Sequence, residues 1–311
     1  MKTIAFIAFL FASVTITHAQ IQWRPQWVAG SKQTIEYIYS KVESMSDTLR
    51  EFDSVHAMIS ARYIGLIDDN FFFEWKFNNF YADTMKGDAS STNKLTYELI
   101  GKTVTRCPVK FMMGKSDFAI TVVNKAQIDS VADIVETEIG ARVPNAKSDD
   151  RATAKIMLHM LYGLKMDDAI YSHIREYYSI YQKRDLKPNE KKDAKSEMIK
   201  QGKGRMSAGA EGYAVLEDKD PKVYRYKYDV NMDLSKMLLD LAKSLGSDDS
   251  TTKKMEKESS KNKMGVETGS ETIINKSDMV VTSYYEYTNT DGSLFMPGAK
   301  ETESILIRAI K

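Results

Sequence analysis

The fold is decided by the segment VHAMISARYIGLIDDNFFFEWKF at residues 55–77. Two runs rich in apolar, β-branched and aromatic residues flank the turn-forming residues Asp68, Asp69 and Asn70. Because acidic residues and asparagine favour turns between such runs, this segment predicts a β-hairpin. The chain is therefore expected to begin as antiparallel β structure.

The pattern of strands extends on both sides of the hairpin. Upstream, Ile35, Tyr37 and Tyr39 alternate with other residues, as on a sheet with one buried face. Downstream, further strands are predicted at residues 95–104, 109–113 and 117–123. The connections are too short for crossover helices, so these strands are expected to form an antiparallel meander.

A helical pattern replaces the strands after Asn124. Asn124 and Gln127 resemble a capping box, and they begin a predicted helix that ends near Gly140. Two more amphipathic helices are predicted at residues 150–164 and 167–185, with a tight break between them at Gly163 and Asp167-Asp168.

The last third of the chain returns to strands. They are predicted near residues 213–216, 223–232, 272–274, 279–287 and 302–310, with a short helix from Asp233 to Gly246. Polar segments near 186–212 and 247–263 lack a sustained apolar period and are predicted to be flexible connections.

The order of strands, helices and strands predicts an α+β fold. We expect a curved antiparallel sheet or incomplete β-barrel covered by helices. Residues 20–311 would form a single domain in which both β regions share one sheet, because each region alone would leave edge strands exposed. Two domains divided near Leu186 are the alternative.

Residues 1–19 resemble a secretory signal peptide. A positive start precedes an apolar run at residues 4–16, and Thr17-His18-Ala19 supplies small residues at the cleavage positions. This run is shorter than the roughly 20 apolar residues that cross a membrane. The sequence therefore predicts a mature chain that begins at Gln20, has no transmembrane segment and is periplasmic or secreted.

The amino-acid composition argues against some classes of function. The 311 residues include 44 Lys+Arg and 43 Asp+Glu, a net charge of +1, whereas nucleic-acid binders usually have a basic excess. Cys107 is the single cysteine, so no internal disulfide can form. A small buried apolar residue is the favoured interpretation of Cys107, because no neighbouring His or CxxC partner activates the thiol.

Catalytic and metal-binding signatures are absent from the sequence. The mature chain has three histidines, His56, His159 and His173, and none has metal-ligand spacing; GxSxG and phosphate-loop motifs do not occur. A site that joins His159, His173 and a carboxylate is less favoured than ordinary surface or core-edge histidines. We therefore predict no catalytic residue, no metal and no cofactor.

Aromatic residues give the most distinctive pattern. Phe71, Phe73, Trp75 and Phe77 share one strand face, Tyr224, Tyr226 and Tyr228 share another, and Tyr285 and Tyr287 share a third. A sheet core is the favoured interpretation. The tyrosine hydroxyls also suit a partly hydrated cavity, so a hydrophobic ligand would contact Phe73, Trp75, Tyr226 and Tyr285.

Two stretches carry a resemblance to known families. WVAGSKQTIEYIYS at residues 27–40 and FAITVVNKAQIDSV at residues 118–131, together with a signal peptide ending in Ala-Gln, resemble exported Gram-negative bacterial proteins of unknown function. The arrangement is similar, more distantly, to lipoprotein-carrier proteins, which implies a curved sheet closed by helices over an apolar cavity.

These features favour a non-catalytic binding or carrier module for a hydrophobic small molecule. An envelope protein with a structural role or a protein partner is one alternative, and a secreted hydrolase is another.

Overall fold

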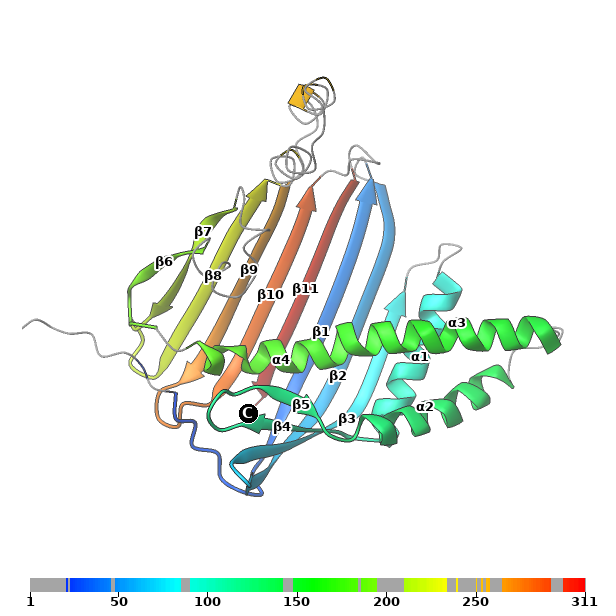
Figure 1. The fold of residues 1–311 in the computed structure, drawn as a ribbon, viewed down its shortest axis with the longest axis horizontal. Coiled ribbons are helices and arrows are strands. Elements are labelled where there is room, and N and C mark those ends of the chain that lie inside the picture. Colours follow the sequence, from blue (N-terminus) through cyan, green and yellow to red (C-terminus); the bar gives the residue numbers. More distant parts are fainter. Residues whose placement is uncertain are drawn as a thin grey trace, which may run out of the picture.

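One open antiparallel sheet organises the computed structural model, and its described part has eleven strands (Figure 1). The strands are β1 (Lys32–Met45), β2 (Thr48–Ile67), β3 (Asn70–Thr84), β4 (Val109–Gly114), β5 (Ile120–Val122), β6 (Lys191–Asp193), β7 (Ala210–Glu217), β8 (Val223–Asp233), β9 (Gly265–Asn275), β10 (Val281–Asp291) and β11 (Ala299–Ile310). Their spatial order is β5-β4-β3-β2-β1-β11-β10-β9-β8-β7-β6. Since β1 lies between β2 and β11, the two β regions share one sheet, as predicted.

The structure describes residues 21, 23–45, 48–84, 90–141, 148–183, 186–194, 210–233, 265–291 and 299–310, with isolated helical residues at 239, 250, 253, 256 and 257. Within these residues, no helix combines the length and the apolar character needed to span a membrane.

The predicted hairpin is formed by β2 and β3. Ile67 pairs with Asn70, and the two residues between them, Asp68 and Asp69, have φ angles of 48° and 58°. A two-residue loop with positive φ at both positions matches the right-handed twist of the flanking strands. Acidic residues tolerate this left-handed conformation better than most others do, which explains their place in the turn.

Helical segments cover one face of the sheet. They are α1 (Ser90–Arg106), α2 (Lys125–Gly140), α3 (Ser148–Met166), the π-helical turn η1 (Asp167–Tyr171), α4 (Ser172–Tyr178) and the 3-10 turn η2 (Ser179–Gln182). The last four follow one another directly and cross the sheet as one long segment (Figure 1). The predicted tight break at Gly163 and Asp167-Asp168 was wrong. The wider π-helical turn lets the chain continue as a helix there.

The predicted strand at residues 95–104 was also wrong, because this stretch belongs to α1. Tyr97, Ile100 and Val104 are buried, at the spacing of one helix face. The helix packs on β3 closely enough that a Cβ on Gly101 would lie 2.4 Å from the Phe80 ring. Gly101 therefore allows the helix to pack closely on the sheet and does not mark the end of a strand.

Two smaller predictions differ from the structure. The strand expected at residues 117–123 is reduced to Ile120–Val122. The polar segment near 186–212 contains the short strand β6 and the start of β7. Residues 195–209, nearly all of the helix expected after Asp233 and most of the segment 247–263 lie outside the described residues.

Candidate functional site

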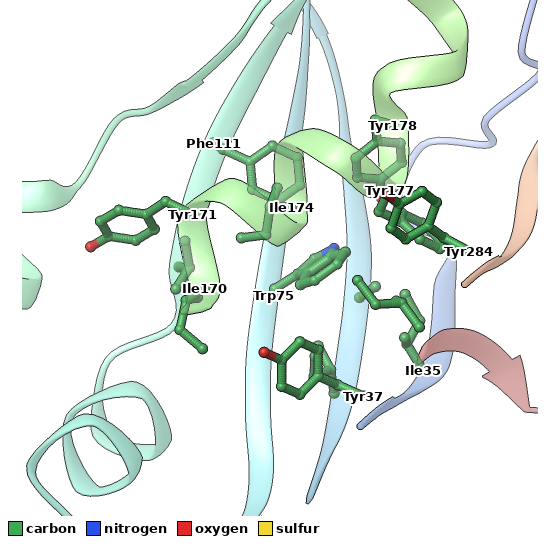
Figure 2. Close-up of a cluster of buried hydrophobic side chains, with 14 of the residues drawn as sticks. Ile35, Tyr37, Trp75, Phe111, Ile170, Tyr171, Ile174, Tyr177, Tyr178 and Tyr284 are labelled. Carbon is green, nitrogen blue, oxygen red and sulfur yellow. The ribbon is translucent and has the colours of Figure 1, made fainter. Parts of the chain in front are cut away.

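Phe73 and Trp75 lie in an aromatic cluster between β3 and the long helical segment, where each ring lies near that of Tyr178. Figure 2 shows Trp75 within this cluster. Both side chains are buried, and Trp75 is only 1% exposed. The centroid of the Trp75 ring lies 5.8 Å from that of Tyr177 and 6.0 Å from that of Phe111. The two predicted residues therefore share one face, as their alternation indicates, and that face is filled by protein side chains.

The other two predicted residues lie on opposite faces of the sheet. Tyr226 is buried and lies on the same face of the sheet as Tyr37, which faces the helices. The two tyrosines belong to one row of directly paired residues across neighbouring strands: Tyr226, Thr272, Tyr284, Ile307 and Tyr37. Tyr285 pairs with Glu271 on the far side and is 41% exposed. The structure thus brings three of the four residues to one side and separates Tyr285 from them. Contact of any of them with a ligand stays a prediction.

Tyrosine hydroxyls fasten the helical segment to the sheet. Tyr177 donates a hydrogen bond to the carbonyl of Val281 at 2.9 Å, and Tyr181 donates one to the carbonyl of Met279 at 2.9 Å. From the sheet, Tyr37 donates a 2.6 Å hydrogen bond to the carbonyl of Ala169 in η1. These hydroxyls satisfy backbone groups across the helix–sheet junction, so they are already engaged within the protein.

His173 lies at the edge of the aromatic cluster. Its Nδ1 lies 2.8 Å from the Tyr37 hydroxyl, and its ring centroid lies 5.9 Å from that of Tyr39. Burial lowers the pKa of His173 to about 4, against a smaller raising effect of its hydrogen bond to the backbone of Ala169. His173 is therefore neutral at physiological pH.

Beyond His173 the same face of the sheet becomes acidic. Successive cross-strand rows place Asp53, Lys41, Glu303 and Thr288 side by side, and then Glu43, Glu301 and Thr290. In these rows Lys41 pairs with Glu43 at 2.8 Å and Glu301 at 3.5 Å. Burial raises the pKa of both Asp53 and Glu301. The charge of Lys165 is the main opposing effect at Asp53, and that of Lys41 is the main opposing effect at Glu301.

A cavity of about 260 Å³ lies where the two regions meet. Its lining residues are Ser172, His173, Glu176, Glu286, Thr288, Glu303 and Ile305. Among the described residues, the lining contains three glutamates and no lysine or arginine, and His173 is neutral, so the formal charge of this lining is negative. Burial raises the pKa of Tyr39, and the charge of the Glu303 carboxylate and its hydrogen bond to this tyrosine raise it further.

A second cleft, of about 660 Å³, lies at the ends of β7 to β11. Among the described residues, its lining includes the acidic residues Glu211, Asp233, Glu267, Asp291 and Glu301 and one basic residue, Lys300. Both described cavities therefore carry an excess of carboxylates. Sequence reasoning missed both sites, because these carboxylates are far apart in the chain and come together only through the strand register and, for Glu176, through the packing of α4 on the sheet.

His159 and His173, which the sequence analysis considered as members of one site, are not in contact with each other. His173 faces Tyr37, whereas His159 lies near α2, where its Nδ1 is 3.3 Å from Oε2 of Glu136. His159 thus joins a carboxylate without His173. The sequence signal for this contact was weak, since Asp133 and Glu136 lie three positions apart in an otherwise ordinary helix.

Comparison with known proteins gives no family. No protein-family model matches the chain, and no curated protein matches it in sequence. Among solved structures, lipovitellin, described in a study of its lipid–protein interactions, aligns with 92% of this chain at 7% identity and a TM-score of 0.41, and the alignment covers 26% of the lipovitellin chain. A structure from the de novo design of transmembrane β-barrels aligns over 92% of this chain and 99% of its own, at 5% identity and a TM-score of 0.15. Likenesses this low do not bear on function.

Proposed function

We propose that this chain is a non-catalytic binding or carrier module, and that its ligand combines an apolar body with a cationic head group. The observation that carries this proposal is the division of the helix-facing side of the sheet. Aromatic side chains fill one part of it, and carboxylates line the cavity beside that part.

The charge of the cavity lining favours a ligand whose head group is cationic. Glu176, Glu286 and Glu303 surround a space that is large enough for an ammonium group and its neighbouring atoms. These carboxylates would attract a cation, whereas they would repel the carboxylate of a fatty acid. The apolar wall of the cavity is Ile305, which pairs with Tyr39 on the adjacent strand.

The aromatic cluster would supply the apolar part of the site. Phe73 and Trp75 are buried against Tyr178 of α4, and Tyr226 is buried with the Lys183 ammonium over its ring. A ligand can touch these residues only when such contacts open. In this proposal the head group is held in the cavity and the apolar body extends toward these three residues.

We expect a fluorescent long-chain alkylamine to bind about tenfold more tightly than a fatty acid of the same chain length, a difference that corresponds to about 1.4 kcal/mol. Fluorescence titration of both probes measures it. Replacing Glu303 by Gln should remove most of this preference, because one cavity charge is lost. The matched control is Glu271→Gln, on the far face of the same sheet, which should leave it unchanged. Equal affinity for the two probes, or no binding of either, would contradict the proposal.

An interaction protein is the second candidate, and a different surface favours it. Ile156, Met157, Met160 and Leu164 on α3 are each more than half exposed, and so is Ile134 on α2. Exposed apolar patches of this kind mark protein or membrane contacts. Failure of both amphiphilic probes would favour this second function over the first.

We also propose that the chain is exported to the periplasm or secreted, on the strength of the signal-like residues 1–19. Expression of the full chain in a Gram-negative host should yield a mature protein that begins at Gln20. Intact mass spectrometry measures this directly. A product that retains Met1 would overturn the assignment of compartment.

A further inference from the structure

A separate polar cluster lies away from the sheet, where α2 and α3 approach each other. Asp133 and Glu136 are three residues apart on α2, which places them on one helix face, and His159 comes from α3. One potential ligand atom from each residue lies within 4.8 Å of the other two. The Nδ1 atom of His159 is 3.3 Å from Oε2 of Glu136 and 3.6 Å from Oδ1 of Asp133.

Glu136 is the unusual member of this cluster. Its side chain is 2% exposed, and among the residues that the structure describes, its Oε1 has no hydrogen-bond partner. Glutamate is almost never fully buried unless it is paired, because removing a carboxylate from water is costly. An unpartnered oxygen on a buried carboxylate thus points to a missing cationic partner.

His159 alone compensates this carboxylate poorly. Its Nδ1 can carry only one proton, yet it faces oxygens of two carboxylates. Both separations exceed the usual length of a charge-assisted hydrogen bond, about 2.7–2.9 Å. They agree better with donor atoms that surround a common ion, since neighbouring ligands of a tetrahedral ion with bonds of about 2.0–2.1 Å lie about 3.4 Å apart.

We propose that Asp133, Glu136 and His159 bind a divalent first-row transition metal ion, with Zn²⁺ as the preferred occupant. The donor set is one imidazole nitrogen and two carboxylate oxygens. Calcium and magnesium prefer sites built wholly from oxygen, so the imidazole favours a transition metal over them. Two carboxylates also neutralise the double positive charge of the ion.

The surroundings of the cluster define the kind of site. The side chains of His159 and Asp133 are 53% and 63% exposed, so an ion would be reached directly from solvent. Three protein ligands leave a fourth position for water. Because the ligands come from two helices, the bound ion joins α2 to α3 and stabilises the folded chain by mass action.

The test uses tag-free protein that begins at Gln20 and has been stripped of metal with a chelator. Calorimetric titration with ZnCl₂ should show one ion per chain, and thermal unfolding should shift to higher temperature as Zn²⁺ is added. Co²⁺ should give the visible absorption bands of a four- or five-coordinate site. Absence of saturable Zn²⁺ binding would overturn the proposal.

Two variants and a control test whether His159 and Glu136 bind the Zn²⁺ ion. His159→Ala should weaken Zn²⁺ binding by at least about tenfold, and His56→Ala, which removes an exposed histidine on β2, should leave it unchanged. Glu136→Gln should abolish the Zn²⁺-dependent thermal shift without lowering the melting temperature of the metal-free chain, because it removes an undercompensated buried charge. Zn²⁺ binding that survives His159→Ala unchanged would place the ion elsewhere and overturn this site.

Discussion

Replacing Trp75 with alanine is expected to lower the free energy of unfolding by about 3–5 kcal/mol, the usual cost of truncating a large buried aromatic side chain. Trp75 is 1% exposed, and its ring packs against Phe111, Tyr177 and Tyr178. The substitution would therefore leave a cavity at the helix–sheet junction. Chemical denaturation of the variant and the parent, with the slopes compared, measures the loss.

The control for this experiment is Tyr285→Ala. Tyr285 is also an aromatic residue of the sheet, but it lies on the exposed face, and its loss should cost less than about 1 kcal/mol. If Trp75→Ala cost no more than Tyr285→Ala, the placement of Trp75 under the helical segment would be wrong. A strongly destabilised Trp75→Ala variant, together with no uptake of either amphiphile by the parent chain, would assign the aromatic cluster to the core alone.

Acidification from pH 7 to pH 5 is expected to cost about 2 kcal/mol of stability through His173 alone. Burial lowers its pKa in the folded chain to about 4, whereas an unfolded histidine titrates near 6.5. Between these values the unfolded chain binds more protons than the folded chain. This contribution to stability is therefore complete above about pH 6.5, decreases as the pH falls, and is fully lost below about pH 4.

The comparison that isolates this effect is between the parent chain and His173→Gln. Free energies of unfolding at pH 7 and pH 5 give the pH dependence of each, and the variant should lose about 2 kcal/mol less on acidification. His56→Gln, at an exposed position, serves as the control and should keep the parental pH dependence. Identical pH dependence of His173→Gln and the parent would show that His173 is not held neutral.

The sequence predicted the sheet well where one face is apolar. The hairpin at Asp68-Asp69 and the buried alternation of Ile35, Tyr37 and Tyr39 follow from local turn chemistry and a period of two. The pattern failed at residues 95–104, where β-branched residues suggested a strand. There the spacing of Tyr97, Ile100 and Val104 was the better signal, because it reports the buried face and not only the propensity of each residue.

The candidate sites were much harder to predict. Tyr284 and Tyr285 are adjacent and chemically alike, and only the register with β9 and β11 decides which of them faces the helices. The glutamates of the central cavity come from α4, β10 and β11, so no local motif could unite them. The contact of His159 with Glu136 depends on how α2 packs against α3, which single-sequence patterns do not specify.

The pairing of β1 with β11 also constrains how the chain acquires its structure. These central strands are joined by contacts such as that between Glu36 and Arg308, which are 272 residues apart in sequence. Contacts between such distant residues form slowly, because a long loop must close before they are gained. Until β11 has emerged from the ribosome, β1 has only β2 beside it and β10 has only β9. The middle of the sheet is therefore completed late, when β11 enters between the exposed edges of β1 and β10.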